Sequence, residues 1–430
     1  MTGLARAGKT ALLTSLAANL QAGPAALPAL AERLEGRAWS VTPSPAGATS
    51  MPRFDVAFHV RALAADPPSW PARTDAVSLL ALDVDVTRPG LASLLPPRRL
   101  RLEFLDYPGE WLVDLPMLGA SFEAWSATAF SRLETVEAAG PFRAFVAGLP
   151  RQCGADEVIA AQGVALYRSA LNGARDAGLA LLQPGRLLMP APGPEPPWVS
   201  FFPFTRSGTG LGTGSGGLHD LLARRYDAYL AAVRRELAEP GLGRLDRLVV
   251  LADLLGALAA GPAAFADAAA ALGTVSRALR AAKAPVWLAW LAPLLPALGG
   301  IGRTAFVASK ADHVADRQRG NLARLMGAVC KAGGEDAAFA VAAIRCTEDV
   351  VWPLDGHPVS AVRGRVTGEG KMGRSYPGEV PDSPPDAAFW AHPFLRLPSF
   401  EPARIEPGPR PPIPQIGLDR LLVWLIGDLL

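Results

Sequence analysis

The chain has 430 residues, of which half are hydrophobic and 19% are charged, and its formal net charge is +2. This length and apolarity permit one large domain or two to three ordinary ones, while the balanced charge, without a run of Lys or Arg, argues against nucleic-acid binding. Three scattered cysteines without a CxxC pair (Cys153, Cys330 and Cys346) argue against a disulfide framework or a zinc site and fit a reducing cytosol.

A glycine-bounded loop opens the chain. Residues 3–10 read GLARAGKT and match the pattern GxxxxGK[ST]. Glycines let the backbone curl and aim its N–H groups at a phosphate; Lys9 is expected to reach the β- and γ-phosphates, and the Thr10 hydroxyl to bind Mg²⁺. Apolar spacing predicts a helix over residues 11–22, whose N-terminus favours anions. The alternative is a chance match in an Ala- and Gly-rich chain. The predicted nucleotide contacts of the loop are Gly3, Arg6, Ala7, Gly8, Lys9, Thr10 and Ala11.

Two strands are predicted next, over residues 77–86 and 100–105, and they are expected to pair antiparallel because no long helix separates them. The second strand ends at Asp106-Tyr-Pro-Gly109, the DxxG pattern of GTPases. Asp106 is expected to hold Mg²⁺ through a water, and Gly109 to donate its N–H to a γ-phosphate. Asp-x-Pro-Gly is also a plain turn signal, which stays open as the alternative. Glu110 stands where many GTPases have a water-orienting Gln; it is a candidate catalytic residue beside Lys9, although its carboxylate would repel a γ-phosphate.

An Ala- and Leu-rich stretch with helical charge spacing, residues 115–240, is interpreted as a helical insertion that contains a Gly/Ser/Thr loop at 207–217. Three apolar strands follow, separated by helical stretches, and predict a mostly parallel α/β sheet. Residues 284–301 carry no charge but contain three prolines, so we expect a buried or surface helix, with membrane contact as the alternative. The three strands are predicted at 248–252, 304–308 and 339–344.

The strand at 304–308 leads into Ser309-Lys310-Ala311-Asp312, close to the [NT]KxD pattern of GTPases. Lys310 is expected to pack on the base, and Asp312 to accept from guanine N1–H and N2–H₂, donors that adenine lacks. The alternative is a helix N-cap at Ser309 or Asp312. Backbone contact with the base is expected near Ala343 and Ile344, after the next strand.

The remaining chain, 357–414, is rich in Pro and Gly and is expected to wrap over the core, and residues 418–430 predict an amphipathic helix that docks. The predicted fold class is therefore an α/β, P-loop NTPase-type fold with a large helical insertion. The predicted segments are a first GTPase part at 1–114, the insertion at 115–240, a second GTPase part at 241–350 and a C-terminal extension at 351–430.

Several stretches in this order resemble the YcjX-like P-loop GTPases of bacteria: TGLARAGKT, LDYPGEWLVDLPML, LQPGRLLMP, ASKADHV, YPGEVP and the closing LDRLLVWLIGDLL. The resemblance implies a cytosolic, stress-associated GTP-binding protein with a large helical insertion. It also implies that residues 70–74 form the first switch segment, which makes Thr74 a candidate ligand of Mg²⁺ and the γ-phosphate. From the residues alone, Thr74 is only a polar residue in a Pro-flanked loop.

The chain differs from these GTPases at its start. A strand normally precedes the phosphate-binding loop, but only two residues stand before Gly3. We therefore expect the first strand to be missing from this chain and the natural protein to start upstream. Three functions are weighed. The first is a switch that binds GTP/GDP and Mg²⁺, hydrolyses GTP slowly and contacts a protein partner through the insertion. The second is an ATPase. The third is a nucleotide-stabilised, non-hydrolysing scaffold or membrane-associated adaptor. The expected localisation is cytoplasmic, with peripheral contact with the inner membrane as the alternative.

Overall fold

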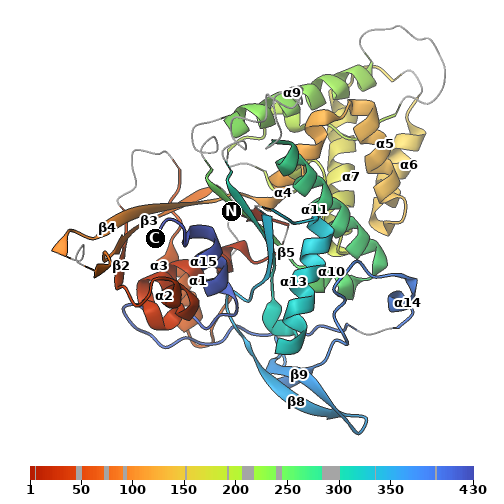
Figure 1. The fold of residues 1–430 in the computed structure, drawn as a ribbon. Coiled ribbons are helices and arrows are strands. Elements are labelled where there is room, and N and C mark those ends of the chain that lie inside the picture. The colour runs from red at the N-terminus through yellow and green to blue at the C-terminus, as the bar shows by residue number, and fades with distance from the viewer. Residues whose placement is uncertain are drawn as a thin grey trace. The chain divides into compact units, whose positions relative to one another are not determined.

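The computed structural model describes residues 1–4, 6–44, 51–71, 77–90, 94–150, 153–190, 193–205, 217–238, 245–282, 301–334, 336–392 and 395–430 (Figure 1). For Glu110, Leu112 and the C-terminal ends of two helices only the backbone is described. The chain forms two compact units, described separately below. The first comprises Met1–Pro108, Arg247–Gly261 and Arg303–Leu430, and the second Gly109–Asp246 and Pro262–Gly302. The four segments predicted from the sequence stay a prediction about domains.

The first unit is built on a parallel sheet in the order β1-β5-β6-β7. Thr2 pairs with Val250, and Phe306 of β6 pairs with Ala338 of β7. The strands β5 and β6 are nearly continuous apolar runs, as expected of strands covered on both faces. The prediction of a mostly parallel α/β sheet is confirmed. These strands are β1 (Thr2–Gly3), β5 (Arg247–Ala252), β6 (Arg303–Ala308) and β7 (Asp336–Ala340).

An antiparallel sheet in the order β2-β3-β4 belongs to the same unit, formed by β2 (Trp39–Pro43), β3 (Ser78–Val86) and β4 (Arg98–Asp106). The predicted antiparallel pair is β3 with β4. Met1 N–H donates to Leu105 O at 2.6 Å, and Tyr107 N–H donates to Met1 O at 3.0 Å. Since these bonds have a parallel pattern, β1 lies between β4 and β5. The expectation that the first strand is missing is therefore not confirmed, because two of its residues pair here.

Helices pack against these sheets around one apolar core that includes Leu13, Leu82, Val307 and Leu421. The predicted C-terminal helix docks there, and its Asp419 carboxylate accepts from Ala29 N–H at 3.2 Å. The helices of this unit are α1 (Lys9–Ala22), η1 (Pro24–Ala26), α2 (Pro28–Arg33), α3 (Val56–Ala64), α10 (Leu254–Ala260), η7 (Ala311–His313), α13 (Asp316–Cys330), α14 (Ala387–Trp390) and α15 (Leu418–Ile426).

The C-terminal extension is more regular than predicted. It contains β9 (His357–Arg365) and β10 (Met372–Ser375), which form an antiparallel sheet with β8 (Thr347–Leu354), and the β8–β9 hairpin projects from the parallel sheet (Figure 1). Pro353 and Pro358 pair across the hairpin. Prolines in a strand obscure its sequence signal, which explains why this sheet was missed. The strand predicted at 339–344 is also corrected, because β7 ends at Ala340.

The second unit is helical, and the bounds 115–240 predicted for the insertion stay a prediction. An aromatic cluster of Trp125, Tyr167, Phe201 and Tyr226 fills its core, with ring centroids 5.3–6.4 Å apart. The elements are α4 (Gly109–Leu112), η3 (Leu115–Gly119), α5 (Phe122–Leu133), η4 (Glu137–Ala139), α6 (Gly140–Gly148), α7 (Glu157–Asp176), α8 (Gly185–Leu188), η5 (Pro197–Val199), α9 (Leu218–Ala238) and α11 (Pro262–Ala282).

Two predicted features of this part of the chain cannot be compared with the structure. The loop predicted at 207–217 and the uncharged stretch at 284–301 fall almost entirely outside the described residues. Among the helices that are described, none is both long enough and apolar enough to span a bilayer.

Candidate functional site

The loop after β1 turns through left-handed backbone twice before α1 begins. Arg6 has φ 60° and Gly8, which precedes the first helical residue, has φ 82°. Leu4 N–H continues the pairing with β5 by donating to Leu251 O at 2.8 Å, and the Lys9 ammonium donates to Gly3 O at 3.3 Å. The loop therefore curls over the start of a 14-residue helix, a position that favours an anion.

Oxygen ligands lie at the ends of two elements beside this loop. Thr10 is partly exposed in the first turn of α1, and the Asp106 side chain, 2% exposed, ends β4. Carboxylate and hydroxyl oxygens are the ligands that Mg²⁺ prefers. The chemistry of this donor set therefore fits the predicted metal.

A buried histidine of the same unit, His59 of α3, was not predicted from the sequence. Its side chain is 8% exposed, and its Nδ1 has no hydrogen-bond partner among the described residues. Burial lowers the pKa of His59, and the nearby Asp55 and Asp106 carboxylates partly oppose this shift. No motif marks this position, since a lone histidine in an amphipathic helix is an ordinary core residue.

Three predicted site residues, Gly109, Glu110 and Thr74, lie in the second unit or outside the described residues. Gly109 begins α4 in the second unit, so the boundary between the units falls within the DxxG pattern, after Pro108. The Glu110 side chain and the whole of Thr74 lie outside the described residues. Their contacts with nucleotide, Mg²⁺ and water stay predictions.

The predicted base segment follows β6. Lys310 adopts left-handed backbone with φ 59°, and its ammonium pairs with the Asp253 carboxylate at 2.5 Å. Asp253 follows β5 and caps α10 by accepting from Gly256 N–H at 2.8 Å. Two neighbouring parallel strands therefore bring these side chains together at their carboxyl ends. Asp253 was missed because it looks like a plain helix cap in the sequence.

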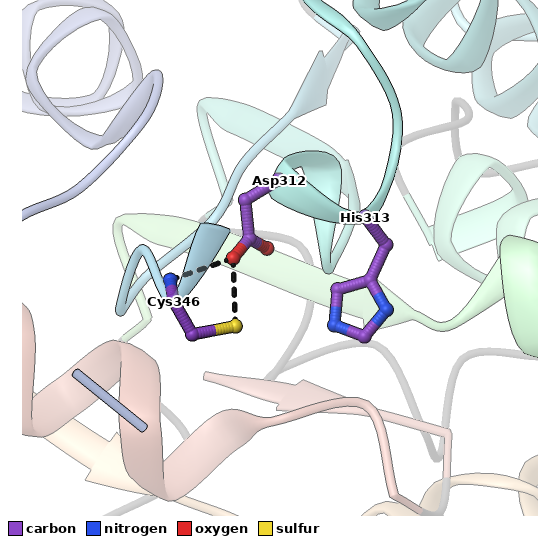
Figure 2. A group of neighbouring side chains, drawn as sticks. All are labelled: Asp312, His313 and Cys346. Carbon is purple, nitrogen blue, oxygen red and sulfur yellow. Dashed lines mark hydrogen bonds between the residues drawn. The ribbon is translucent and has the colours of Figure 1, made fainter. Parts of the chain in front are cut away.

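Asp312 is 2% exposed, and its Oδ2 accepts from Cys346 N–H at 2.8 Å and from the Cys346 thiol at 3.0 Å (Figure 2). Burial, with the carboxylate beside it, raises the pKa of the Cys346 thiol. The Ser309 hydroxyl donates to Ala252 O at 3.2 Å. In the described part of the chain, neither Ser309 nor Asp312 caps a helix with its side chain, so the structure does not favour the N-cap alternative.

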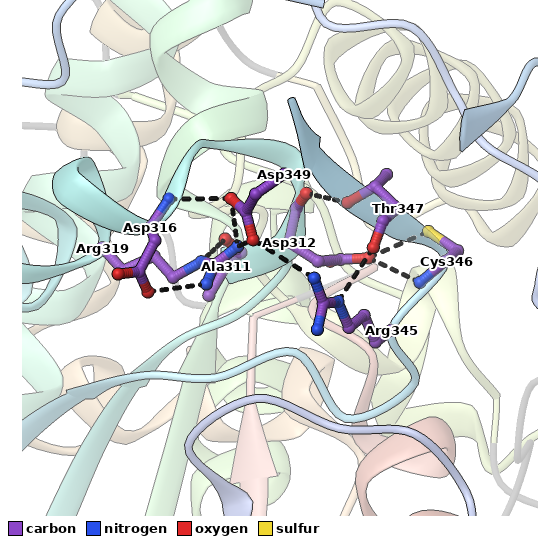
Figure 3. A network of polar contacts seen from close by, with 8 residues as sticks. All are labelled: Ala311, Asp312, Asp316, Arg319, Arg345, Cys346, Thr347 and Asp349. Atoms are coloured by element: carbon purple, nitrogen blue, oxygen red, sulfur yellow. Dashed lines mark hydrogen bonds and ion pairs between the residues drawn. The ribbon is translucent and has the colours of Figure 1, made fainter. Parts of the chain in front are cut away.

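A polar network joins this segment to the start of β8 (Figure 3). The Asp349 carboxylate accepts from Asp316 N–H at 2.9 Å, from Arg319 at 2.8 Å and from Arg345 at 3.2 Å. Arg319 also donates to Ala311 O at 3.1 Å. These residues were not predicted from the sequence, because Asp349 lies 33 positions from Asp316 and 30 from Arg319. Its contact with Arg345, four positions away, is local but has no distinctive pattern.

The segment between β7 and β8 holds the two remaining predicted contacts. Ile344, 3% exposed, packs in an apolar cluster with Leu63 and Ile405. Ala343 is partly buried against the main core, and Arg345 N–H donates to Pro414 O at 2.7 Å. The position of this segment is therefore well defined, and backbone contact of Ala343 and Ile344 with a base stays a prediction.

Within the second unit, the residues that follow the DxxG pattern are anchored to the LQPGRLLMP stretch. The Trp111 indole N–H donates to Met189 O at 3.1 Å, and Gln183 donates to Val113 O. The guanidinium of Arg186, 3% exposed, stacks over Trp111 at 4.7 Å. Such buried cation–π contacts contribute about 2 kcal/mol, so α4 is held firmly.

Asp114 completes this anchor as a fully buried carboxyl group. It accepts from Gly185 N–H at 2.8 Å and from the Tyr229 hydroxyl. Burial raises its pKa to about 7, although Tyr229, Gly185 N–H and the Arg186 charge all favour the carboxylate. Asp267 of α11 accepts from Leu181 N–H at 2.8 Å, which ties a further helix to the residue just before this stretch.

The first unit is thus an α/β structure with a mostly parallel sheet, consistent with a GTPase-like fold. The model of the YcjX-like family, DUF463, matches residues 1–430, and the chain belongs to this family. It is 31% identical over 449 residues to the "Ras-like GTPase YcjX" of Escherichia coli (strain K12), covering all of this chain and 94% of that protein. It is 30% identical over 463 residues to the Shewanella oneidensis protein of the same name, covering all of this chain and 93% of that protein.

Proposed function

We propose that this chain binds GTP and GDP, hydrolyses GTP slowly with Mg²⁺, and acts as a nucleotide switch. The observation that carries the proposal is the position of two segments on one sheet. The loop before α1 follows β1, and the Asp312 segment follows β6, so both leave the carboxyl edge of the same parallel sheet. Ligands of open α/β sheets bind at this edge. The names of the relatives, Ras-like GTPases, support the same nucleotide.

The proposed hydrolysis depends on stabilising negative charge on the phosphates. The loop amides and the Lys9 ammonium stabilise charge on the transferring phosphoryl group, which is the main task in this reaction. Thr10 and Asp106 would hold Mg²⁺, which when bound neutralises phosphate charge. We assign Gly109 N–H and Thr74 to the γ-phosphate. Glu110 remains a candidate for orienting water.

The base is selected by Asp312. Because Oδ2 already accepts two hydrogen bonds from Cys346, we assign the other oxygen to guanine N1–H and N2–H₂. A buried, pre-oriented carboxylate rejects a base without these donors, since the carboxylate would be left unpaired. Lys310, held by Asp253, supplies its aliphatic stem to the face of the base.

The second unit is the proposed output of the switch. The chain passes directly from Pro108 into α4, and Trp111 and Asp114 anchor that segment to the LQPGRLLMP stretch. If a γ-phosphate displaces the DxxG pattern, α4 and the residues packed against it should therefore move as well. We propose that this helical unit binds a protein partner in a bacterial stress response. We also propose that the protein is cytoplasmic, with peripheral contact with the inner membrane as an alternative.

The test compares the binding of fluorescent GDP, ADP and xanthosine diphosphate, with Mg²⁺, to the full chain and its variants. Lys9→Ala should weaken GDP binding by roughly 10- to 100-fold, the cost of charge-assisted hydrogen bonds, whereas the exposed Lys371→Ala should not.

Asp312→Asn separates the guanine and adenine hypotheses. The Asn oxygen can keep the contacts with Cys346, while the Asn NH₂ group takes the place of the oxygen assigned to the base. An NH₂ group cannot accept from guanine, so GDP binding should weaken. It can donate to the C2 carbonyl of xanthine, so xanthosine diphosphate should bind better. The exposed Asp382→Asn is the matched control. Equal binding of ADP and GDP, unaffected by Asp312→Asn, would refute the guanine assignment.

A further inference from the structure

Three metal-ligating side chains meet beside the proposed base site. One donor atom each from Asp312, His313 and Cys346 lies within 4.8 Å of the others. Asp312 and His313 belong to η7, and Cys346 precedes β8. Figure 2 shows a ring nitrogen of His313 facing the Cys346 thiol, with the Asp312 carboxylate beside both. The sequence did not suggest this group, because Cys346 lies 34 positions from Asp312 and no CxxC or HxxxH spacing is present.

Among the described residues, the His313 imidazole contacts one aromatic ring, that of Phe400, at 5.2 Å between centroids. His313 is 9% exposed. Within the described part of the chain neither ring nitrogen has a hydrogen-bond partner. Buried polar groups are almost always paired, so this nitrogen, aimed at a thiol and a carboxylate, points to a ligand. The charge of the nearby Lys310 is already paired with Asp253 and opposes a cation less than a lone ammonium would.

We propose that Asp312, His313 and Cys346 form a site for a borderline-soft divalent cation, best satisfied by Zn²⁺. Imidazole nitrogen, thiolate sulfur and carboxylate oxygen are the ligands of zinc, and three protein ligands leave a fourth tetrahedral position for water. The thiol hydrogen now lies between Sγ and Oδ2. Binding releases this proton to solvent as the Sγ–metal bond forms. One dication then faces one thiolate and one carboxylate, so charge is balanced.

This site and the guanine site share Asp312, so metal and nucleotide oppose each other; this consequence rests on the proposed function. A dication on Oδ2 neutralises the charge of the carboxylate, so the other oxygen accepts from guanine N1–H and N2–H₂ much more weakly. Because coupling between two binding sites is reciprocal, GDP must weaken the binding of the metal by the same factor. The inferred role is an inhibitory metal site that closes the base pocket. It is distinct from the Mg²⁺ expected at the all-oxygen ligands Thr10 and Asp106.

Co²⁺, added alone to the metal-free full chain, is the first probe. A thiolate–Co²⁺ charge-transfer band should appear at one equivalent, with release of one proton. Cys346→Ser should lose the band yet stay folded, because a hydroxyl also donates to Oδ2. Cys153→Ser, a cysteine outside the cluster, should keep the band. His313→Ala should weaken the affinity for Co²⁺ by about tenfold or more. Absence of the band, or its persistence in Cys346→Ser, would overturn the site.

A second measurement tests exclusion and separates the two proposals. Zn²⁺ at one equivalent should weaken Mg²⁺-GDP binding by at least about tenfold, and this effect should disappear in Cys346→Ser. If GDP binds as proposed and no Co²⁺ band forms, the metal site is wrong and the proposed function stands. If the band forms and GDP does not change it, the metal site stands and the assignment of guanine to Asp312 is wrong.

Discussion

The buried carboxyl group of Asp114 should make the stability of the second unit depend on pH. The informative change is Asp114→Asn, which keeps an oxygen for Gly185 N–H and the Tyr229 hydroxyl but cannot ionise. Any difference between the two chains that varies with pH therefore reports the titration of this one group. The native carboxyl group is fully buried, so solvent screening does not weaken the effect.

The magnitude follows from the shift of the pKa from 3.8 in the unfolded chain to about 7 in the folded one. Between these values the unfolded state has lost the proton and the folded state retains it, so the free energy of unfolding falls as pH rises, by about 1.4 kcal/mol per pH unit. The stabilisation is fully present below the unfolded pKa and is lost as pH approaches the folded one. Over the whole window the loss is about 4 kcal/mol, and Asp114→Asn should not show it.

The assay is urea unfolding followed by tryptophan fluorescence, at several values between about pH 4 and about pH 8, because the change falls between the two pKa values. The stability of Asp114→Asn relative to the unmodified chain should rise up to about pH 7 and then level off. The exposed Asp176→Asn is the matched control and should follow the unmodified chain. A stability difference that is the same at both ends of the range would refute the burial argument.

Three further changes test packing, the loop and the base network. Gly163→Ala would place a Cβ 2.2 Å from the Phe202 ring and should destabilise the chain by about 1–3 kcal/mol in thermal unfolding. The control Gly148→Ala, whose Cβ meets nothing within 4 Å, should not destabilise it. Equal melting temperatures of the two variants would contradict the close packing of Gly163 against Phe202. Gly8→Ala at φ 82° should cost about 1–2 kcal/mol and weaken GDP binding, and unchanged GDP affinity would argue against the loop geometry. Asp349→Ala releases two arginines and should weaken GDP binding by about 1 kcal/mol, measured by titration, unless the network plays no part in binding.

Patterns confined to one element were predictable from the sequence. The strands β5 and β6 are nearly continuous apolar runs, and β3 and β4 lack a helix between them, so strand type and pairing followed from local chemistry. The helix predicted over residues 11–22 is α1, which begins two residues earlier, at Lys9. These elements place the loop and the Asp312 segment, and they were located within one or two residues at most ends.

Features that depend on distant partners were not predictable. The contacts of Asp312 with Cys346 span 34 positions, and those of Asp114 with Tyr229 span 115. Neither pair has a spacing that a single sequence can distinguish from chance. The sheet formed by β8, β9 and β10 was missed for a different reason, because prolines at the hairpin disrupt the alternation that marks a strand.

The passage from Pro108 to Gly109 has a mechanical consequence. The chain crosses between the two compact units four times, and the first crossing, the peptide bond from Pro108 to Gly109, lies inside the DxxG pattern. A flexible linker of n residues would let its ends drift by roughly 5–6 Å × √n, and a small displacement at one end would be lost in that slack. At this crossing no linker residue intervenes, and Trp111, three residues after Pro108, donates a hydrogen bond to Met189 O within the second unit. A displacement of the DxxG pattern is therefore not lost in a flexible linker before it reaches α4.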